Sequence, residues 1–199
     1  MKLIIGTKNQ DKLKEIKKLL AGAALEVLSL KDFPRCPDVV EDGRTFEANA
    51  RKKAKIYSEV TGELTLADDS GLVVPSLNGR PGVYSARFAG EGCTYHDNNL
   101  KLLKLLADTQ GTKRAAKFVC VMALYYKGRA AGVVRGECRG KIGFQERGRN
   151  GFGYDPVFIP NGFLKTFAEL SPSIKNKTSH RGKALRAAKK AVLTFLKLR

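Results

Sequence analysis

The chain contains 199 residues with a mass of 21.8 kDa; 43% are hydrophobic, 28% are charged, and the formal net charge is +18. The apolar fraction excludes an intrinsically disordered chain, and the length suits one domain with one sizeable core. No run approaches the ~20 apolar residues of a membrane-spanning helix, and the apolar run at residues 3–5 is too short for a signal peptide. The four cysteines lie far apart without metal-binding spacing. We therefore expect a cytoplasmic protein with neither a zinc site nor a disulfide framework.

The N-terminal part predicts a strand, a loop, a helix and a second strand. Residues 2–6 form a short apolar strand, and Asn9 begins a helix whose apolar residues recur at helical spacing as far as Leu20. Residues 25–30 give the second strand. This opening is typical of an α/β fold.

Two capped helices and one strand follow. Thr45 is a suitable N-cap for a helix that has Phe46, Ala50, Ala54 and Tyr57 on its apolar face. Residues 64–67 form an apolar strand that leads into two aspartates, and residues 72–74 continue it. The Gly/Pro-rich residues 75–90 indicate a loop. Thr94 and Asp97 then resemble a capping box for a helix that extends to about Leu106.

The C-terminal part predicts a hairpin, a further strand and a helix. Residues 115–126 and 130–138 are rich in β-formers and are joined by a turn at 127–129. A Gly-aromatic turn and a strand occupy residues 151–159. The last helix begins around Ser179, with Leu185, Ala188, Val192 and Leu196 on its buried face.

Four segments carry candidate chemistry. Residues 6–12 place a polar loop and two lysines, Lys8 and Lys12, at a helix N-terminus, which suits phosphate. Asp68 and Asp69 follow a buried strand, where carboxylates suit Mg²⁺ and one of them suits a general base. The alternatives are an ordinary β–α turn with solvated lysines and an Asp-Asp-Ser-Gly surface turn. Glu41 and Asp42 are further acids, with a solvated loop as the alternative.

The remaining two segments are aromatic and basic. Residues 151–156 set two aromatic rings between glycines, which suits a flat ligand, with a tight turn packed into the core as the alternative. Residues 175–181 combine lysines, His180 and Arg181 near a helix start, which suits an anion, with a basic cap region as the alternative. The other histidine, His96, is expected on the exposed first turn of its helix.

Taken together, the sequence resembles the inosine triphosphate pyrophosphatase family. The matching segments fall in the family's order and span nearly the whole chain. They are Gly6-Thr7-Lys8-Asn9, Thr45-Phe46-Glu47-Ala48-Asn49-Ala50, Ala67-Asp68-Asp69-Ser70-Gly71-Leu72, Pro81-Gly82-Val83-Tyr84-Ser85-Ala86-Arg87, Gly151-Phe152-Gly153-Tyr154-Asp155-Pro156 and Ser179-His180-Arg181-Gly182.

The resemblance implies a Mg²⁺-dependent enzyme that hydrolyses ITP, dITP and XTP to the monophosphate and pyrophosphate. It implies one α/β domain over residues 1–199, with an elongated mixed sheet, flanking helices and two lobes around a central cleft, and a homodimer as the assembly. Asp69 matches the catalytic position, and the metal candidates are Glu41, Asp68 and Asp69. The matched substrate-binding positions are Thr7, Lys8, Asn9, Lys12, Ser70, Phe152, Gly153, Tyr154, Asp155, Lys175, His180 and Arg181.

Two alternatives stay open at the level of sequence. The first is a related pyrophosphatase that acts on modified pyrimidine triphosphates, against which residues 152–155 and 179–181 argue. The second is a nucleic-acid-binding module, because residues 71–199 carry 24 basic and only 7 acidic residues. The chain has no recognised DNA- or RNA-binding motif. We therefore expect a small-molecule nucleotide as the partner, and neither nucleic acid nor a membrane.

Overall fold

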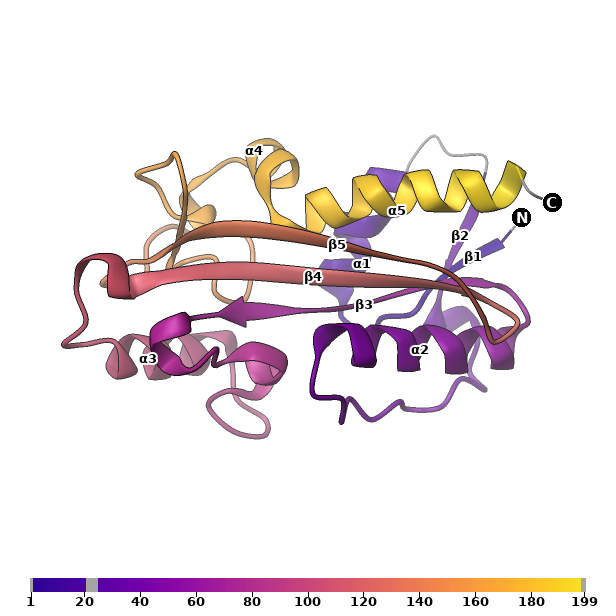
Figure 1. Cartoon of the computed structure of the whole chain (residues 1–199), viewed down its shortest axis with the longest axis horizontal. Helices are drawn as coiled ribbons and strands as arrows, with labels where there is room; N and C mark the ends of the chain where they lie inside the picture. Colours follow the sequence, from indigo (N-terminus) through magenta and orange to yellow (C-terminus); the bar gives the residue numbers. More distant parts are fainter. Residues whose placement is uncertain (1, 21–24, 198–199) are drawn as a thin grey trace. The chain divides into compact units, whose positions relative to one another are not determined.

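The structure is a computed structural model that describes residues 2–20 and 25–197 (Figure 1). The helices are α1 (Gln10–Leu20), α2 (Phe46–Thr61), α3 (Tyr95–Leu105), α4 (Pro172–Thr178) and α5 (His180–Lys197). The strands are β1 (Lys2–Ile5), β2 (Glu26–Ser29), β3 (Leu64–Val73), β4 (Ala115–Tyr126), β5 (Arg129–Ile142) and β6 (Phe158–Pro160). None of the described helices is long and apolar enough to cross a membrane.

The six strands form one mixed sheet in the order β2-β1-β3-β4-β5-β6. Strand β1 pairs in parallel with both β2 and β3, and β6 pairs antiparallel with β5. Lys127 and Gly128, with φ of 46° and 76°, connect β4 to β5. A two-residue connection requires an antiparallel pair, and positive φ at both positions matches its usual turn. The predicted α/β class, mixed sheet and hairpin are confirmed.

Local capping signals explain where the helices begin. The Asn9 side chain accepts hydrogen bonds from the amides of Asp11 and Lys12 at 3.0 and 3.1 Å, which fixes the start of α1. Thr45 accepts from the amide of Ala48 at 3.1 Å at the start of α2. These two predicted helix starts are confirmed, as is the capping box of α3.

Two features differ from the sequence-based interpretation. Strand β3 runs without interruption from Leu64 to Val73, so Asp68 and Asp69 lie inside a strand. The alternative of a surface turn is wrong, because both side chains are buried among partners from neighbouring elements. The short helix α4, capped by Ser171 with Pro172 in its first turn, was not predicted. It is separated from α5 by Ser179 in an extended conformation.

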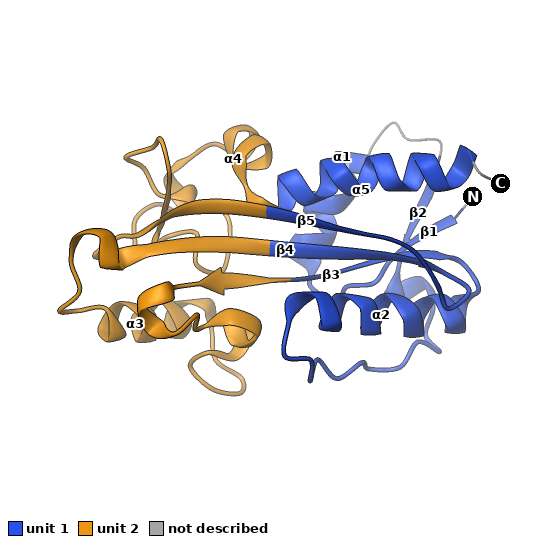
Figure 2. Ribbon diagram, in the orientation of Figure 1, with its two compact units in different colours: residues 1–69, 120–136, 181–199 blue, residues 70–119, 137–180 orange. Residues whose placement is uncertain are grey.

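The chain divides into two compact units (Figure 2). Unit 1 comprises residues 1–69, 120–136 and 181–199, and unit 2 comprises residues 70–119 and 137–180. In unit 1, apolar side chains of α1 and α5 pack with those of β1, β3 and β4 in one core cluster. Unit 2 has a separate cluster that contains Phe118, Phe158 and Phe167. Strands β3, β4 and β5 contribute residues to both units.

Candidate active site

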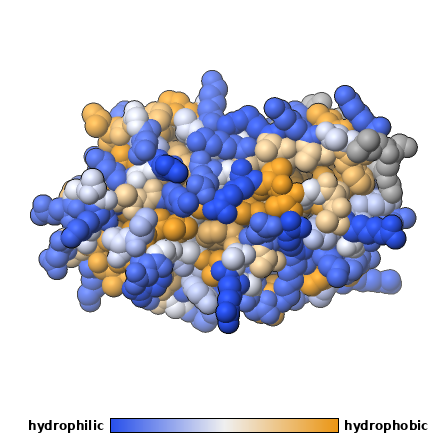
Figure 3. Space-filling model, in the orientation of Figure 1, coloured by the Kyte–Doolittle hydropathy of each residue, from blue (hydrophilic) through white to orange (hydrophobic). Residues whose placement is uncertain are grey.

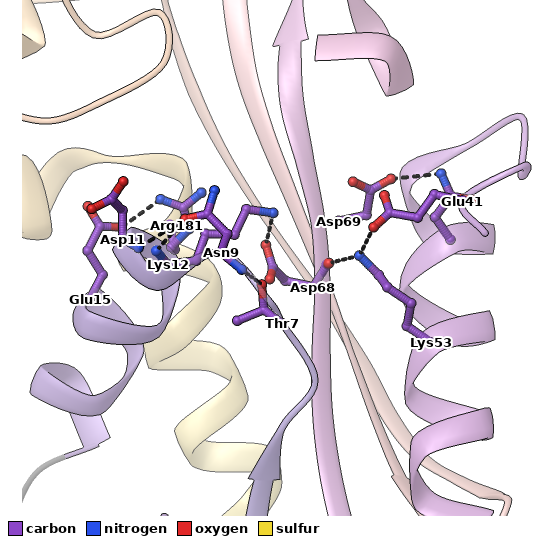
Figure 4. A network of polar contacts seen from close by, with 11 residues as sticks. Thr7, Asn9, Asp11, Lys12, Glu15, Glu41, Lys53, Asp68, Asp69 and Arg181 are labelled. Carbon is purple, nitrogen blue, oxygen red and sulfur yellow. Dashed lines mark hydrogen bonds and ion pairs between the residues drawn. The ribbon is translucent and has the colours of Figure 1, made fainter. Parts of the chain in front are cut away.

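In unit 1, successive side chains of β3 point to opposite sides of the strand, as its pleat requires (Figure 4). Asp68 faces α1 and the start of α5, whereas Asp69 faces α2. Both are almost fully buried, with 2% and 5% of their surfaces exposed. Burial of a carboxylate is costly unless the charge has partners, so the surroundings of each side chain decide its chemistry.

Asp68 lies among cations. Its Oδ2 is 2.9 Å from Nζ of Lys12 in the first turns of α1, and the charge of Arg181 also acts on it. Burial opposes the charged form, but Lys12, Arg181 and Lys53 together outweigh it and hold the pKa of Asp68 far below its usual range. Asp68 is therefore a permanently ionised carboxylate.

Arg181, in the first turn of α5, is held by a second acid. Its Nη1 donates to Oε2 of Glu15 at 2.6 Å, and its side chain is only 5% exposed. Burial alone would lower the pKa of Arg181, but the negative charges of Glu15 and Asp68 raise the pKa by more than burial lowers it. The guanidinium therefore stays charged. The phosphate-binding candidates Lys12 and Arg181 thus converge at Asp68.

Asp69 has a different environment. Its Oδ2 accepts a hydrogen bond from Nδ2 of Asn49 at 2.9 Å. Burial raises the pKa of Asp69 to about 6, and the negative charge of Glu41 adds to the shift against the opposing effects of Lys53 and Asn49. A carboxylate with this pKa is mostly ionised at neutral pH yet basic enough to take a proton from water during turnover.

Two residues of α2 complete this side of the site. Nζ of Lys53 donates to Glu41 Oε1 at 2.7 Å and to the backbone oxygen of Asp68 at 2.6 Å. Asn49 Oδ1 accepts from the amide of Gly43 at 2.7 Å and so ties the loop before α2 to Asp69. Sequence reasoning did not assign a site role to Asn49 or Lys53. The available signal was two polar residues, four positions apart, on the face of α2 that is otherwise apolar.

The donor chemistry around Asp69 fits a hard cation. Glu41 and Asp69 supply carboxylate oxygens close enough for Glu41 to raise the pKa of Asp69, and a divalent cation would offset that repulsion. Among the described residues, no three His, Cys, Asp or Glu side chains gather into a metal-binding group. Mg²⁺ commonly uses one or two carboxylates together with substrate phosphates, so two acids are sufficient.

The N-terminal loop of α1 is shaped by its own residues. Thr7 is buried, and its Oγ1 accepts from the amide of Asn9 at 3.3 Å. The structure therefore gives Thr7 and Asn9 a part in forming the helix start. Lys8 is exposed and pairs with Asp38. A hollow of about 350 Å³ next to this loop includes Thr7, Lys8, Gln10 and Cys36 in its lining.

Unit 2 contains the aromatic segment. Asp155 Oδ2 accepts from Nζ of Lys175 at 2.7 Å and from the amide of Phe152 at 2.8 Å. Nζ of Lys175 also lies 4.8 Å from the centre of the Phe152 ring, and the centre of the Tyr95 ring lies 6.0 Å from it. Gly151 has φ of 79°, and a Cβ there would overlap the Asp155 carboxylate. The buried Asp155–Lys175 pair thus holds the backbone around Phe152.

The other predicted residues of unit 2 are mostly buried. Tyr154 belongs to the core, and its hydroxyl donates to the backbone oxygen of Ser85 at 2.9 Å. The oxygen of Gly153 accepts from Asn99 Nδ2 at 3.1 Å. His180 is stacked on Phe118, with ring centres 4.5 Å apart and planes inclined by 10°. Ser70 is partly buried on β3 directly after Asp69.

Comparison with known proteins identifies close relatives. The model of the Ham1 family matches residues 3–191. A dITP/XTP pyrophosphatase of Exiguobacterium sibiricum is 45% identical over 98% of this chain and 99% of the relative, and one of Desulforamulus reducens is 48% identical over 94% of each. Among solved structures, a HAM1 protein from Coxiella burnetii has a TM-score of 0.89 at 38% identity, covering 98% of both chains. The Staphylococcus aureus Ham1 protein has a TM-score of 0.86 at 37% identity, covering 99% of this chain and 98% of its own.

Proposed function

The chain belongs to the Ham1 family, and from that membership we propose that it hydrolyses the non-standard purine triphosphates dITP, ITP and XTP to monophosphate and pyrophosphate. The observation that carries the proposal is the pair of adjacent aspartates on β3, one surrounded by cations and the other with a pKa of about 6. The first arrangement suits the binding of a polyanion, and the second suits proton transfer from water.

In the proposed reaction, Asp69 accepts a proton from a water molecule as the water oxygen bonds to the α-phosphorus of the triphosphate. The bond between the α- and β-phosphates breaks, and pyrophosphate leaves with the displaced electron pair. Lys12, Arg181 and the N-terminus of α1 neutralise part of the substrate charge, which is where phosphoryl transfer gains most of its rate.

We propose Mg²⁺ as the cofactor, held by Glu41 and Asp69. When bound, the ion would supply positive charge to the phosphates and make water more acidic. Asp68 is less suited to hold the ion, because its charge is already balanced by Lys12 and Arg181. Lys53 would position Glu41 by its 2.7 Å contact.

We assign recognition of the nucleobase to unit 2. The ring of Phe152 offers a stacking surface, and the backbone donors of Gly153 and Tyr154 with His180 suit the oxygen at position 6 of hypoxanthine and xanthine. Adenine presents an amino group there, and donors left facing an amine would cost binding free energy. The Asp155–Lys175 pair would fix this segment in place rather than contact the base.

We further propose a homodimer in the cytoplasm, where nucleotide pools are used. Phe144 and Leu164 of unit 2 are 72% and 88% exposed, and together with Ile159 they help to line a hollow of about 500 Å³. An apolar surface of this kind favours association. Light scattering on the wild type and on a Phe144→Asp/Leu164→Asp variant tests the dimer, which only the wild type should form.

A hydrolysis panel tests the reaction and the substrate class together. The purified protein is incubated with Mg²⁺ and each of ITP, dITP, XTP, ATP, GTP and modified pyrimidine triphosphates, and pyrophosphate is quantified separately from phosphate. Selective release of pyrophosphate from ITP, dITP and XTP is expected. Preference for a pyrimidine triphosphate would favour the related branch, and no release from any substrate would refute the proposal.

A further inference from the structure

The C-terminal helix α5 carries positive charge without any acid. Its 18 residues include Arg181, Lys183, Arg186, Lys189, Lys190 and Lys197 and contain no Asp or Glu. Only Arg181 of these residues takes part in the proposed nucleotide site. The charge on the rest of α5 is therefore not explained by the reaction.

The apolar and basic residues of α5 lie on different sides. Leu185, Ala188 and Val192 are buried in the core of unit 1. Lys183, Arg186, Lys190 and Lys197 are exposed, at intervals of three, four and seven residues that place them along one side of a helix. At 1.5 Å per residue, this row is about 20 Å long.

Helix α1 extends the same positive surface. Its Leu13, Ile16 and Leu20 are buried in the core cluster that also holds α5, so the two helices are neighbours in one layer. Its Lys14, Lys17 and Lys18 are exposed. We call the seven exposed cations of the two helices the basic face. They are Lys14, Lys17, Lys18, Lys183, Arg186, Lys190 and Lys197.

The two helices that carry the basic face contain two acids, Asp11 and Glu15, against ten lysines and arginines. Glu15 accepts a hydrogen bond from Arg181, which lies outside the face. Asp32 is close enough to Lys17 for that lysine to help lower its pKa, although hydrogen bonds from Ser29 account for most of the shift. In the space-filling view, hydrophilic side chains project around the rim of the visible face, and apolar side chains gather mainly between them (Figure 3).

The arrangement of the cations and the residue types exposed between them indicate which polyanion the basic face fits. A lipid surface would require several exposed apolar residues between the cations. Among the described side chains of these two helices, Leu193 at 41% is the one large apolar side chain that is exposed, and the apolar sides of both helices are otherwise packed in the core. Single-stranded nucleic acid would require exposed rings for stacking. Apart from His180, Phe195 is the one aromatic residue of these two helices, and it packs against Tyr126 at 5.7 Å. A duplex requires only an extended row of positive charge along its phosphates.

We propose that the basic face binds the phosphate backbone of double-stranded nucleic acid without sequence preference. The earlier expectation that nucleic acid is not a partner depended on the lack of a recognised motif, and backbone binding needs none. The interaction is independent of hydrolysis, because the seven cations lie outside the proposed catalytic and substrate-binding residues. It would place a nucleotide-cleansing activity close to nucleic acid.

Fluorescence anisotropy with a labelled random-sequence DNA duplex tests this surface. The test variant is Lys14→Gln/Lys18→Gln/Lys190→Gln/Lys197→Gln. The matched control removes the same number of exposed lysines from unit 2, as Lys104→Gln/Lys113→Gln/Lys141→Gln/Lys165→Gln. Both variants have the same net charge, so a difference between them reports where the charge lies. Circular dichroism and ITP hydrolysis confirm that each variant is folded, and the pairs Lys14/Lys18 and Lys190/Lys197 are also tested separately.

For the wild type, log affinity should fall with log salt with a slope of about −5 to −6 between about 50 and 200 mM. The test variant should bind roughly 100-fold more weakly with a slope reduced by about 3, and the control should change less than about threefold. Equal losses in both variants, or no binding of the wild type at about 50 mM salt, would overturn the proposal. So would binding to phosphatidylserine vesicles in place of the duplex.

Discussion

Replacing Asp69 by asparagine should abolish most of the turnover and at the same time stabilise the metal-free protein at neutral pH. The side chain keeps its size and can still accept a hydrogen bond from Asn49, which lies 2.9 Å away. It can no longer accept a proton from water. Loss of general-base assistance lowers kcat by about 10² to 10⁴.

The gain in stability follows from the pKa of Asp69. In the unfolded chain an aspartate titrates near its ordinary value of 3.8, whereas in the folded protein the pKa is about 6. As the pH rises through this window, the unfolded chain loses its proton first, so the free energy of unfolding falls. The shift of about two pH units corresponds to about 3 kcal/mol. Asparagine does not titrate and avoids this loss.

Thermal unfolding in EDTA at about pH 4 and about pH 7.5 measures the effect. The wild type and Asp69→Asn should have similar unfolding temperatures at the lower pH. At the upper pH, Asp69→Asn should unfold about 6–12 °C above the wild type. Asp68→Asn is the matched control on the same strand, and it should destabilise the protein at pH 7.5 because it leaves Lys12 without its carboxylate partner and Arg181 with Glu15 alone. A variant Asp69→Asn that is less stable than the wild type at pH 7.5, or one with near wild-type turnover, would refute this reasoning.

Three further predictions concern other parts of the site. Lys12→Met leaves the buried Asp68 carboxylate short of its nearest cation and should cost about 3 kcal/mol in urea unfolding, whereas an unchanged midpoint would contradict the ion pair. Lys175→Met frees Asp155 and should raise KM for ITP about tenfold or more with a smaller effect on kcat, so a change confined to kcat would argue against a positioning role. Removal of Mg²⁺ with EDTA should stop hydrolysis, and added Mg²⁺ should restore it; turnover that persists in EDTA would exclude the proposed cofactor.

The sequence was most informative where a single side chain determines local structure. Asn9 and Thr45 mark the starts of α1 and α2 because each caps amides within three residues of itself. The hairpin was predictable for a similar reason, since Lys127 and Gly128 set its turn. The helix α4 was missed because its seven residues carry too few apolar positions for periodicity to identify it.

The partners of the site residues could not be predicted in the same way. Glu15 and Arg181 are 166 positions apart, and only the packing of α1 with α5 brings them together. Asn49 reaches Asp69 across 20 positions because α2 covers one side of β3. No local pattern encodes such pairings, since they depend on which helix lies over which face of the sheet.

The two adjacent aspartates illustrate how one strand can supply two kinds of carboxylate. Residues next to each other in a strand face opposite sides, so Asp68 and Asp69 meet different helices although they share a peptide bond. Lys12 and Arg181 keep Asp68 ionised, while burial and Glu41 raise the pKa of Asp69. An acid whose charge is neutralised by fixed cations gains little from a proton or a metal ion, whereas an acid with a raised pKa gains from both. The division of roles between the two residues therefore depends on their neighbours, and exchanging those neighbours would exchange the roles.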